Sequence, residues 1–171
     1  KIIRKIKKNL ILYVGRVVKE KGLLTLIKAF KMISNKNYKL LIVGDGSYKK
    51  DLKLFVKSEK LSNRISFVGW VNNPQQYYCK SKILVLPTLF EAFGNVLVEG
   101  MHSGVACIAT RNSGGPDEIL ANGKYGYQFE KNNFNDLKEK INFCILNKEI
   151  TNKKILLAKK SLAKYSTLKS L

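Results

Sequence analysis

Short, continuous apolar runs recur along the chain, separated by turns and by stretches in which apolar residues recur at helical spacing. Runs of this kind are typical of strands that are covered on both faces, as in a parallel sheet between two layers of helices. The sequence predicts six such strands, the last at an edge of the sheet, at residues 9–14, 39–43, 64–68, 83–86, 104–109 and 125–129.

The stretches between the strands are predicted to be helices. They cover residues 23–33, the region of 52–56, 74–79, the region from the loop after Glu91 to about 103, 117–120, 134–146 and 151–163. Asn73 and Asn133 are the expected N-caps of two of them. Strands and helices that alternate with short connections indicate an α/β fold, here a Rossmann-like three-layer sandwich with a six-stranded, mainly parallel sheet.

The chain of 171 residues is 45% hydrophobic and 10% aromatic, which is enough for one domain with its own core. We expect a single domain over residues 1–171, without a linker or an internal repeat. No apolar run approaches the roughly 20 residues that cross a bilayer, and the basic start at residues 1–8 lacks the apolar region of a secretory signal. The expected location is therefore cytoplasmic.

The net charge of +20 favours nucleic acid, anionic membrane surfaces or phosphorylated ligands as partners. The basic residues are mostly lysines spread over the whole length rather than clustered with aromatic side chains, so we expect no nucleic-acid binding. We attribute about half of the charge to compositional bias. The rest favours peripheral contact with the inner face of the plasma membrane.

Three cysteines, Cys79, Cys107 and Cys144, lie far apart without metal-ligand or C-x-x-C spacing. They are predicted to be reduced, buried side chains. The only histidine, His102, is interpreted as a structural helix residue. Because the sequence has neither an Asp-x-Asp pair nor a histidine cluster, no metal site is expected.

Two carboxylates bracket the junction between the fourth strand and the next helix: Glu91 in the loop and Glu99 about one turn inside the helix. Ligands of open parallel sheets bind where strands end and helices begin. Free backbone N–H groups at Gly94, Asn95 and Val96 would attract a phosphate. Glu99 could accept hydrogen bonds from the vicinal hydroxyls of a ribose, and Glu91 from those of a sugar.

Other interpretations stay open from the residues alone. Glu91 and Glu99 could be a glycosidase pair: eight residues of helix rise span about 12 Å, against roughly 5–9.5 Å in hydrolases, but a loop position for Glu91 allows a closer approach. A third possibility is that the two glutamates only stabilise the helix N-terminus electrostatically.

The loops after the first two strands also allow two interpretations each. Arg16 and Lys21, after the first strand, could bind a diphosphate or belong to a solvated loop. Gly44-Asp45-Gly46 is a phosphate loop or a tight turn.

Four segments resemble the motifs of retaining glycosyltransferases of family 4, in the same order along the chain. Glu91–Glu99 is similar to the E-x7-E motif of that family, and Gly15–Gly22 to its GR…EKG loop. Phe67–Val71 resembles its FLGxV segment. Ser113–Gly126 resembles the GGPxEI…GKYG signature of the bacterial polysaccharide and lipopolysaccharide-type branch. The resemblance covers about residues 9–146.

The resemblance implies the two-domain GT-B fold, with this chain as the C-terminal, nucleotide-sugar-binding half and the N-terminal acceptor domain absent. It also implies roles for loop residues: a diphosphate cradle at Gly15, Arg16 and Lys21, a base contact at Trp70 and the backbone of Val71, sugar binding by Glu91, phosphate contacts at Gly94, Asn95 and Val96, and a ribose contact by Glu99. Of these, Arg16, Lys21 and Glu91 would take part in catalysis.

The activity implied by the resemblance is transfer of a hexosyl group, with retention, from a nucleoside-diphosphate sugar to a glycan or lipid-linked acceptor. UDP is the expected nucleotide, and neither a metal nor another cofactor is expected. The second domain provides the other wall of the reaction cleft, so we expect this chain alone to bind nucleotide with little or no transfer. The alternative is a stand-alone nucleotide-binding or scaffold module without catalysis.

Overall fold

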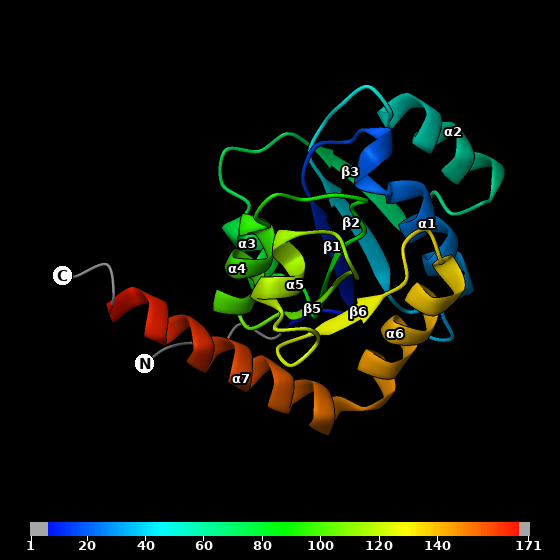
Figure 1. Cartoon of the computed structure of the whole chain (residues 1–171). Helices are drawn as coiled ribbons and strands as arrows, with labels where there is room; N and C mark the ends of the chain where they lie inside the picture. The colour runs from blue at the N-terminus through cyan, green and yellow to red at the C-terminus, as the bar shows by residue number, and fades with distance from the viewer. Residues whose placement is uncertain (1–6, 168–171) are drawn as a thin grey trace.

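The computed structural model describes residues 7–167 and contains a six-stranded sheet in which every strand pairing is parallel. The strand order is β3-β2-β1-β4-β5-β6 (Figure 1). The strands are β1 (Leu10–Val14), β2 (Lys39–Val43), β3 (Ile65–Gly69), β4 (Ile83–Leu86), β5 (Ala106–Thr110) and β6 (Tyr127–Phe129). The predicted α/β fold is confirmed, as is the edge position of the last strand.

Helices connect successive strands in the order that the sequence predicts. They are the short 3-10 helix η1 (Lys19–Lys21), α1 (Leu23–Met32), α2 (Lys49–Ser58), α3 (Gln75–Lys80), α4 (Asn95–His102), α5 (Gly115–Ile119), α6 (Phe134–Leu146) and α7 (Lys148–Thr167). Asn133 caps α6 as expected, because its side chain accepts a hydrogen bond from the N–H of Asp136 at 3.0 Å. Each connection is short enough to hold consecutive elements side by side.

Several strand and helix boundaries differ from the predictions by a few residues, and three of these differences show local features of the chain. The fifth strand begins at Ala106 rather than at residue 104, because Gly104 has a left-handed φ of +68° that turns the chain out of α4. The helix α5 begins at Gly115, two residues early, with a proline in its first turn. The helix α3 begins at Gln75 rather than Pro74, although the Asn73 side chain still accepts the N–H of Gln75 at 2.9 Å.

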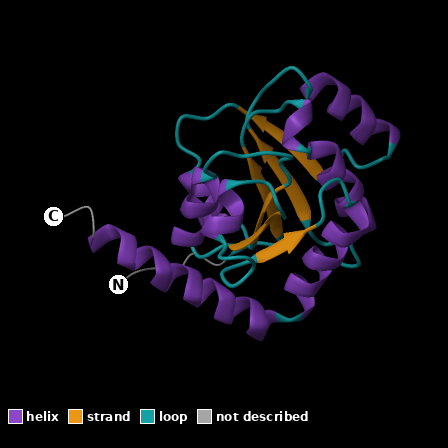
Figure 2. Cartoon of the chain, viewed as in Figure 1, coloured by secondary structure: helices purple, strands orange, loops and turns teal. Residues whose placement is uncertain are grey.

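Helices cover both faces of the sheet, with α1, α2 and α6 on one side and α3, α4 and α7 on the other (Figures 1 and 2). Successive residues of β1 point to opposite faces. Ile11 and Tyr13 therefore join the core under α1 and α6, whereas Leu12 joins the core under α3 and α4. This double burial explains why the strands are continuous apolar runs rather than alternating ones.

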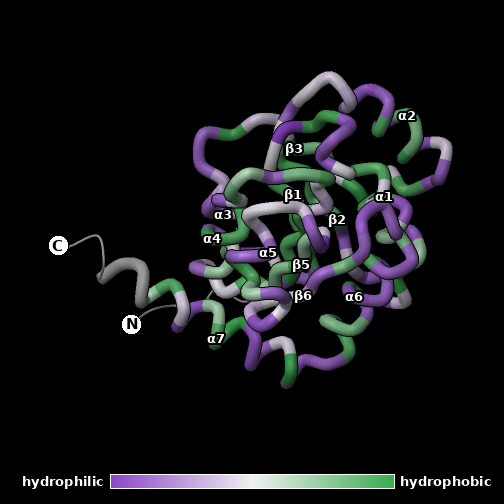
Figure 3. The backbone as a smooth tube through the Cα atoms, in the orientation of Figure 1, coloured by the Kyte–Doolittle hydropathy of each residue, from purple (hydrophilic) through white to green (hydrophobic). Residues whose placement is uncertain are grey.

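Apolar residues concentrate in the strands and on the inner sides of the helices, and polar residues lie outside them (Figure 3). Among the helices of residues 7–167, none has both the length and the apolar character needed to cross a membrane. The start of the chain, which is predicted not to be a secretory signal, lies largely outside the described residues.

The three cysteines have free thiols. Cys107 and Cys144 are buried as predicted, and burial raises the pKa of both thiols to about 12, so they stay protonated at neutral pH. The prediction was wrong for Cys79, which is only half-buried because it lies on a partly exposed side of α3. His102 is the exposed last residue of α4.

The loop after β1 packs directly on the chain that leaves β4. A Cβ atom on Gly22 would lie 1.9 Å from the backbone oxygen of Pro87, and the N–H of Leu89 donates to the Glu20 carbonyl at 3.0 Å. Since β1 and β4 are neighbours at the point where the strand order reverses, this contact lies at the switch point of the sheet.

We predict that Gly22→Ala lowers the free energy of unfolding by more than about 4 kcal/mol, because the new methyl group meets backbone that cannot move aside. The matched control is Gly69→Ala. Gly69 also has a positive φ, but a Cβ atom there meets only the end of the Lys49 side chain, at 3.8 Å. The loss in free energy of unfolding for Gly69→Ala should therefore stay near the roughly 1–2 kcal/mol that a left-handed backbone conformation costs a residue with a side chain. Equal losses for the two variants in guanidinium unfolding would contradict the backbone contact at Gly22.

Candidate functional site

A pocket of about 250 Å³ opens at the carboxyl ends of β1, β2 and β3. Backbone bonds join the three strand ends: the Gly15 N–H donates to Val43 at 3.0 Å, and the Gly44 N–H donates to Gly69 at 2.8 Å. The pocket is lined by Val14, Gly15, Arg16, Val43, Gly44, Asp45, Trp70, Val71 and Pro74. It therefore brings together Gly15, Arg16, Trp70 and Val71 from separate predicted motifs.

Two charged side chains line this pocket, Arg16 and Asp45, and the charge of Asp45 is balanced by a neighbouring lysine. The acidic lining residue Asp45 bonds to the Lys49 ammonium at 2.8 Å, and this bond, followed by one from the Gly46 N–H, holds the pKa of the Asp45 carboxyl below its usual range. Arg16 is exposed at the pocket, where its guanidinium can reach an anion. The backbone of Arg16 is fixed from below, because the buried Tyr13 hydroxyl donates to its carbonyl at 2.6 Å.

Lys21 and Glu91 form an ion pair across the switch point. The Lys21 Nζ atom lies 2.6 Å from Glu91 Oε2, and the two side chains are only 14% and 25% exposed. Lys21 comes from η1 after β1, and Glu91 from the loop after β4. The structure thus joins the cation predicted to bind diphosphate to the carboxylate predicted to bind sugar, a contact that the sequence does not predict.

The Glu91 loop rests on the Gly114–Gly115 turn. The Glu91 N–H donates to Ser113 at 2.8 Å, and the Gly115 N–H donates to the Glu91 carbonyl at 2.9 Å. A Cβ atom at Gly114 would lie 2.6 Å from the Glu91 oxygen, and one at Gly115 would lie 2.2 Å from the Phe93 oxygen. Both glycines are therefore required by backbone that passes directly over them.

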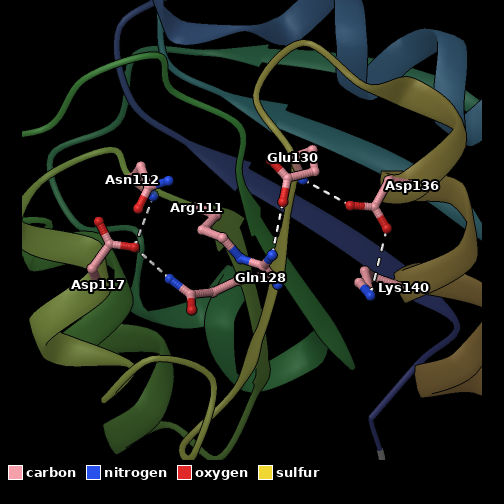
Figure 4. A network of polar contacts seen from close by, with 7 residues as sticks. All are labelled: Arg111, Asn112, Asp117, Gln128, Glu130, Asp136 and Lys140. Atoms are coloured by element: carbon pink, nitrogen blue, oxygen red, sulfur yellow. Dashed lines mark hydrogen bonds and ion pairs between the residues drawn. The ribbon is translucent and has the colours of Figure 1, made fainter.

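Asp117 fastens this turn in place (Figure 4). Its carboxylate accepts hydrogen bonds from the N–H groups of Asn112 at 3.0 Å, Ser113 at 3.0 Å and Gly114 at 3.1 Å. The side chain of Gln128 on β6 adds a fourth bond at 2.5 Å. Sequence reasoning missed this role; the available signal was an acidic residue three positions after a glycine at a helix start.

The helix α4 begins where the sequence predicts. Gly94 is its N-cap, with a left-handed φ of +94°, and Asn95 and Val96 form the first turn, which contains no acidic residue. No side chain caps this helix end, so first-turn N–H groups and the positive end of the helix dipole are available to an anion. The predicted position of this helix N-terminus is confirmed, whereas phosphate binding to it stays a prediction.

Glu99 lies one turn inside α4 and is exposed. Its Oε2 atom accepts a hydrogen bond from the hydroxyl of Tyr78 on α3 at 2.7 Å. Tyr78 is fully buried and was not among the predicted site residues. The two glutamates of the motif thus have different partners, since Glu91 bonds to Lys21 and Glu99 to Tyr78.

The predicted site residues fall into three neighbouring groups at the carboxyl edge of the sheet. Gly15, Arg16 and Val71 line the pocket, Lys21 and Glu91 form the ion pair, and Gly94, Asn95, Val96 and Glu99 belong to α4 or its cap. Within residues 7–167, no group of three or more His, Cys, Asp and Glu side chains is arranged to hold a metal ion. That the reaction needs no metal stays a prediction.

Ligands of doubly wound sheets bind at this edge, beside the switch in strand order, and the strand order here is that of a Rossmann-type sheet. The chain is accordingly a Rossmann-like domain with its candidate ligand site at this edge of the sheet. The chain belongs to the group 1 family of glycosyl transferases, whose family model matches residues 1–161.

Two curated bacterial relatives illustrate the similarity. The chain is 31% identical over 132 residues to N-acetylgalactosamine-N,N'-diacetylbacillosaminyl-diphospho-undecaprenol 4-alpha-N-acetylgalactosaminyltransferase of Campylobacter jejuni, covering 77% of this chain and 36% of that protein. It is 36% identical over 135 residues to the capsular polysaccharide biosynthesis glycosyltransferase CapM of Staphylococcus aureus, covering 75% and 34%. The chain therefore spans little more than a third of the length of these relatives.

Among solved structures, a TarM mutant of S. aureus in complex with fondaparinux, alpha-GlcNAc-glycerol and UDP is similar, with a TM-score of 0.86 and 22% identity. The similarity covers 94% of this chain and 33% of that one. At this identity it shows the fold alone, which is the α/β Rossmann-like fold of GT-B glycosyltransferases.

We predict that Asp117→Ala lowers the free energy of unfolding by about 2–3 kcal/mol, because three backbone N–H groups lose a charged acceptor together. The control is Glu118→Ala, which removes the neighbouring exposed carboxylate of the same short helix and should change stability by less than about 0.5 kcal/mol. Urea unfolding measures both. Similar values for the two variants would show that Asp117 does not fasten the turn.

Proposed function

We propose that this chain is the donor-binding domain of a retaining glycosyltransferase of family 4, which transfers a hexosyl group from a UDP-sugar to a glycan or lipid-linked acceptor. The observation that carries this proposal is the ion pair between Lys21 and Glu91, with 2.6 Å between Nζ and Oε2. The reaction breaks the bond between the sugar and the diphosphate. A cation for the diphosphate and a carboxylate for the sugar must therefore lie side by side, as these two do.

The neighbouring groups would hold the rest of the donor. Trp70 and Val71 line the pocket, and the flat base would lie against Trp70 and the backbone of Val71. Glu99 would accept hydrogen bonds from the ribose hydroxyls. The choice of UDP is supported by the presence of UDP in the TarM complex, which shares the fold.

Negative charge develops on the diphosphate as the sugar leaves. Arg16, Lys21 and the N–H groups of Gly94, Asn95 and Val96 would stabilise it, because the Lys21 side chain, the α4 terminus and the backbone of Arg16 are fixed before the donor arrives. Arg16 is held through its carbonyl by Tyr13, and the α4 terminus is set by the Gly94 cap. These three cationic or dipolar groups could thus stabilise the leaving diphosphate without a metal or another cofactor.

The acceptor would be bound by a second, N-terminal domain of the same protein, since the chain spans 36% and 34% of the lengths of the two relatives. A lipid-linked acceptor is supported by the Campylobacter relative, whose name specifies a diphospho-undecaprenol substrate. Such an acceptor would bring the cytoplasmic enzyme into peripheral contact with the inner face of the plasma membrane, aided by the net charge of +20.

We predict that Arg16→Ala and Glu99→Ala each weaken UDP binding by about 1–3 kcal/mol, the usual value of a hydrogen bond to a charged group. Arg111→Ala is the matched control, because Arg111 is also exposed but pairs with Glu130 at 2.7 Å. Isothermal titration calorimetry on the 171-residue chain measures all three. Unchanged UDP affinity in both variants would contradict the assignment of Arg16 and Glu99 to the nucleotide site.

We predict that Glu91→Ala leaves UDP affinity within about threefold, since Lys21 stays in place for the diphosphate, but abolishes most of the turnover of an enzyme that contains both domains. Sugar transfer to a lipid-linked glycan and calorimetry with UDP provide the two measurements. Equal losses in both would argue against Glu91 as a sugar contact. Intact UDP binding without turnover in the unmodified two-domain protein would favour the stand-alone binding module instead.

A panel of nucleotides and nucleotide sugars in a thermal-shift assay tests the nature of the donor. A ligand that binds only the folded chain raises its melting temperature. We expect UDP and UDP-hexoses to stabilise the chain more than GDP, ADP or uridine. A larger rise in melting temperature with GDP or ADP would identify that nucleotide as the donor's nucleotide in place of UDP. The rest of the proposal would be unaffected.

A further inference from the structure

The hydroxyl of Tyr78 is the buried partner of an exposed carboxylate. It donates to Glu99 Oε2 at 2.7 Å, and the tyrosine side chain is completely inaccessible to solvent. The aromatic ring packs in the core under α3 and α4 with Leu84, Leu97 and Met101. The hydroxyl position is therefore set by a rigid core, whereas Glu99 has three rotatable side-chain bonds and stands at the surface.

A second contact ties the same two helices one turn away. Gln75 Nε2 donates to the Ser103 hydroxyl at 3.1 Å. Gln75 and Tyr78 are three residues apart on α3, and Ser103, the C-cap of α4, follows Glu99 by four residues, so each pair lies on one helix face. The face of α3 that meets α4 is thereby fixed at both ends, which orients the Tyr78 hydroxyl toward Glu99.

The chemistry of the pair leaves Glu99 free to bind a ligand. Burial, and then the bond to Glu99, raise the pKa of Tyr78 above its usual range, so the hydroxyl remains a donor at every physiological pH. A tyrosine supplies one proton and an ionised carboxylate offers about four acceptor positions. Tyr78 therefore occupies one of them and leaves the Oε1 atom and the remaining positions for other donors.

We infer that Tyr78 is a positioning residue that holds the Glu99 carboxylate in the orientation required by the ribose hydroxyls of the nucleotide. This rests on the proposed function, in which Glu99 is the ribose contact. Without the Tyr78 hydroxyl, Glu99 would have to be ordered each time a nucleotide binds, and the entropy lost in ordering it would weaken the complex.

The test compares UDP with 2′-deoxy-UDP by calorimetry on the 171-residue chain and its Tyr78→Phe variant, which keeps the ring in the core and removes only the hydroxyl. We expect Tyr78→Phe to weaken UDP binding about five- to tenfold and to weaken binding of 2′-deoxy-UDP, which keeps only the 3′-hydroxyl, by a smaller factor of about two to three. In a Glu99→Gln background, Tyr78→Phe should have little further effect on UDP, because the two residues act through one contact.

The control is Tyr127→Phe. Tyr127 is also buried, and its hydroxyl shares a hydrogen bond of 2.9 Å with Thr151, between β6 and α7. This variant should lose stability in unfolding experiments but keep the UDP to 2′-deoxy-UDP ratio of the unmodified chain. A hydroxyl with a purely structural role would not change the ratio of the UDP and 2′-deoxy-UDP affinities. A change of this ratio in Tyr78→Phe but not in Tyr127→Phe therefore supports the positioning role.

The outcomes separate this inference from the proposed function. If the unmodified chain prefers UDP and Tyr78→Phe weakens both nucleotides equally, or neither, the positioning role of Tyr78 is overturned and the donor site stands. If the unmodified chain binds UDP and 2′-deoxy-UDP equally, Glu99 is not the ribose contact and both assignments fail. If it binds neither, the proposed function fails as well.

Discussion

Backbone packed directly on backbone at the carboxyl edge of the sheet is the constraint on which the rest of the structure depends. The loop after β1 lies against Pro87 at Gly22, and the loop after β4 lies against the Gly114–Gly115 turn after β5. Side chains would separate these segments by several ångströms. Because glycine allows the contact, loops from distant parts of the sequence share one small region beside the switch in strand order.

The candidate site residues of this region are held in place by partners that lie beneath them. Tyr13 supports the backbone of Arg16, Tyr78 supports the carboxylate of Glu99, and Asp117 supports the turn under Glu91. Each of these supports comes from a buried or part-buried side chain. A rigid core therefore determines where the exposed groups can be, which is the arrangement that a preorganised electrostatic site requires.

The sequence predicts the fold well because the strands are buried on both faces. Every residue of a run such as Ile83–Leu86 is therefore apolar, and such a run is easy to recognise. It also predicts the strand-to-helix junction that places Glu91 and Glu99. The partners of these carboxylates could not be predicted. Lys21 is 70 residues from Glu91 and Tyr78 is 21 residues from Glu99, and such pairings depend on how the layers pack rather than on local pattern.

The pairing of Lys21 with Glu91 has a consequence for which ligands can enter. Each charge is the counterion of the other, so an incoming anion has to share the Lys21 ammonium with a carboxylate that is anchored to the same protein. Because the charge of Lys21 is already balanced, a ligand with one negative charge, such as a free carboxylate, gains little from this lysine alone. A ligand with several charges can also engage Arg16 and the α4 terminus. The paired arrangement of Lys21 and Glu91 would thus favour ligands with several negative charges over ligands with one.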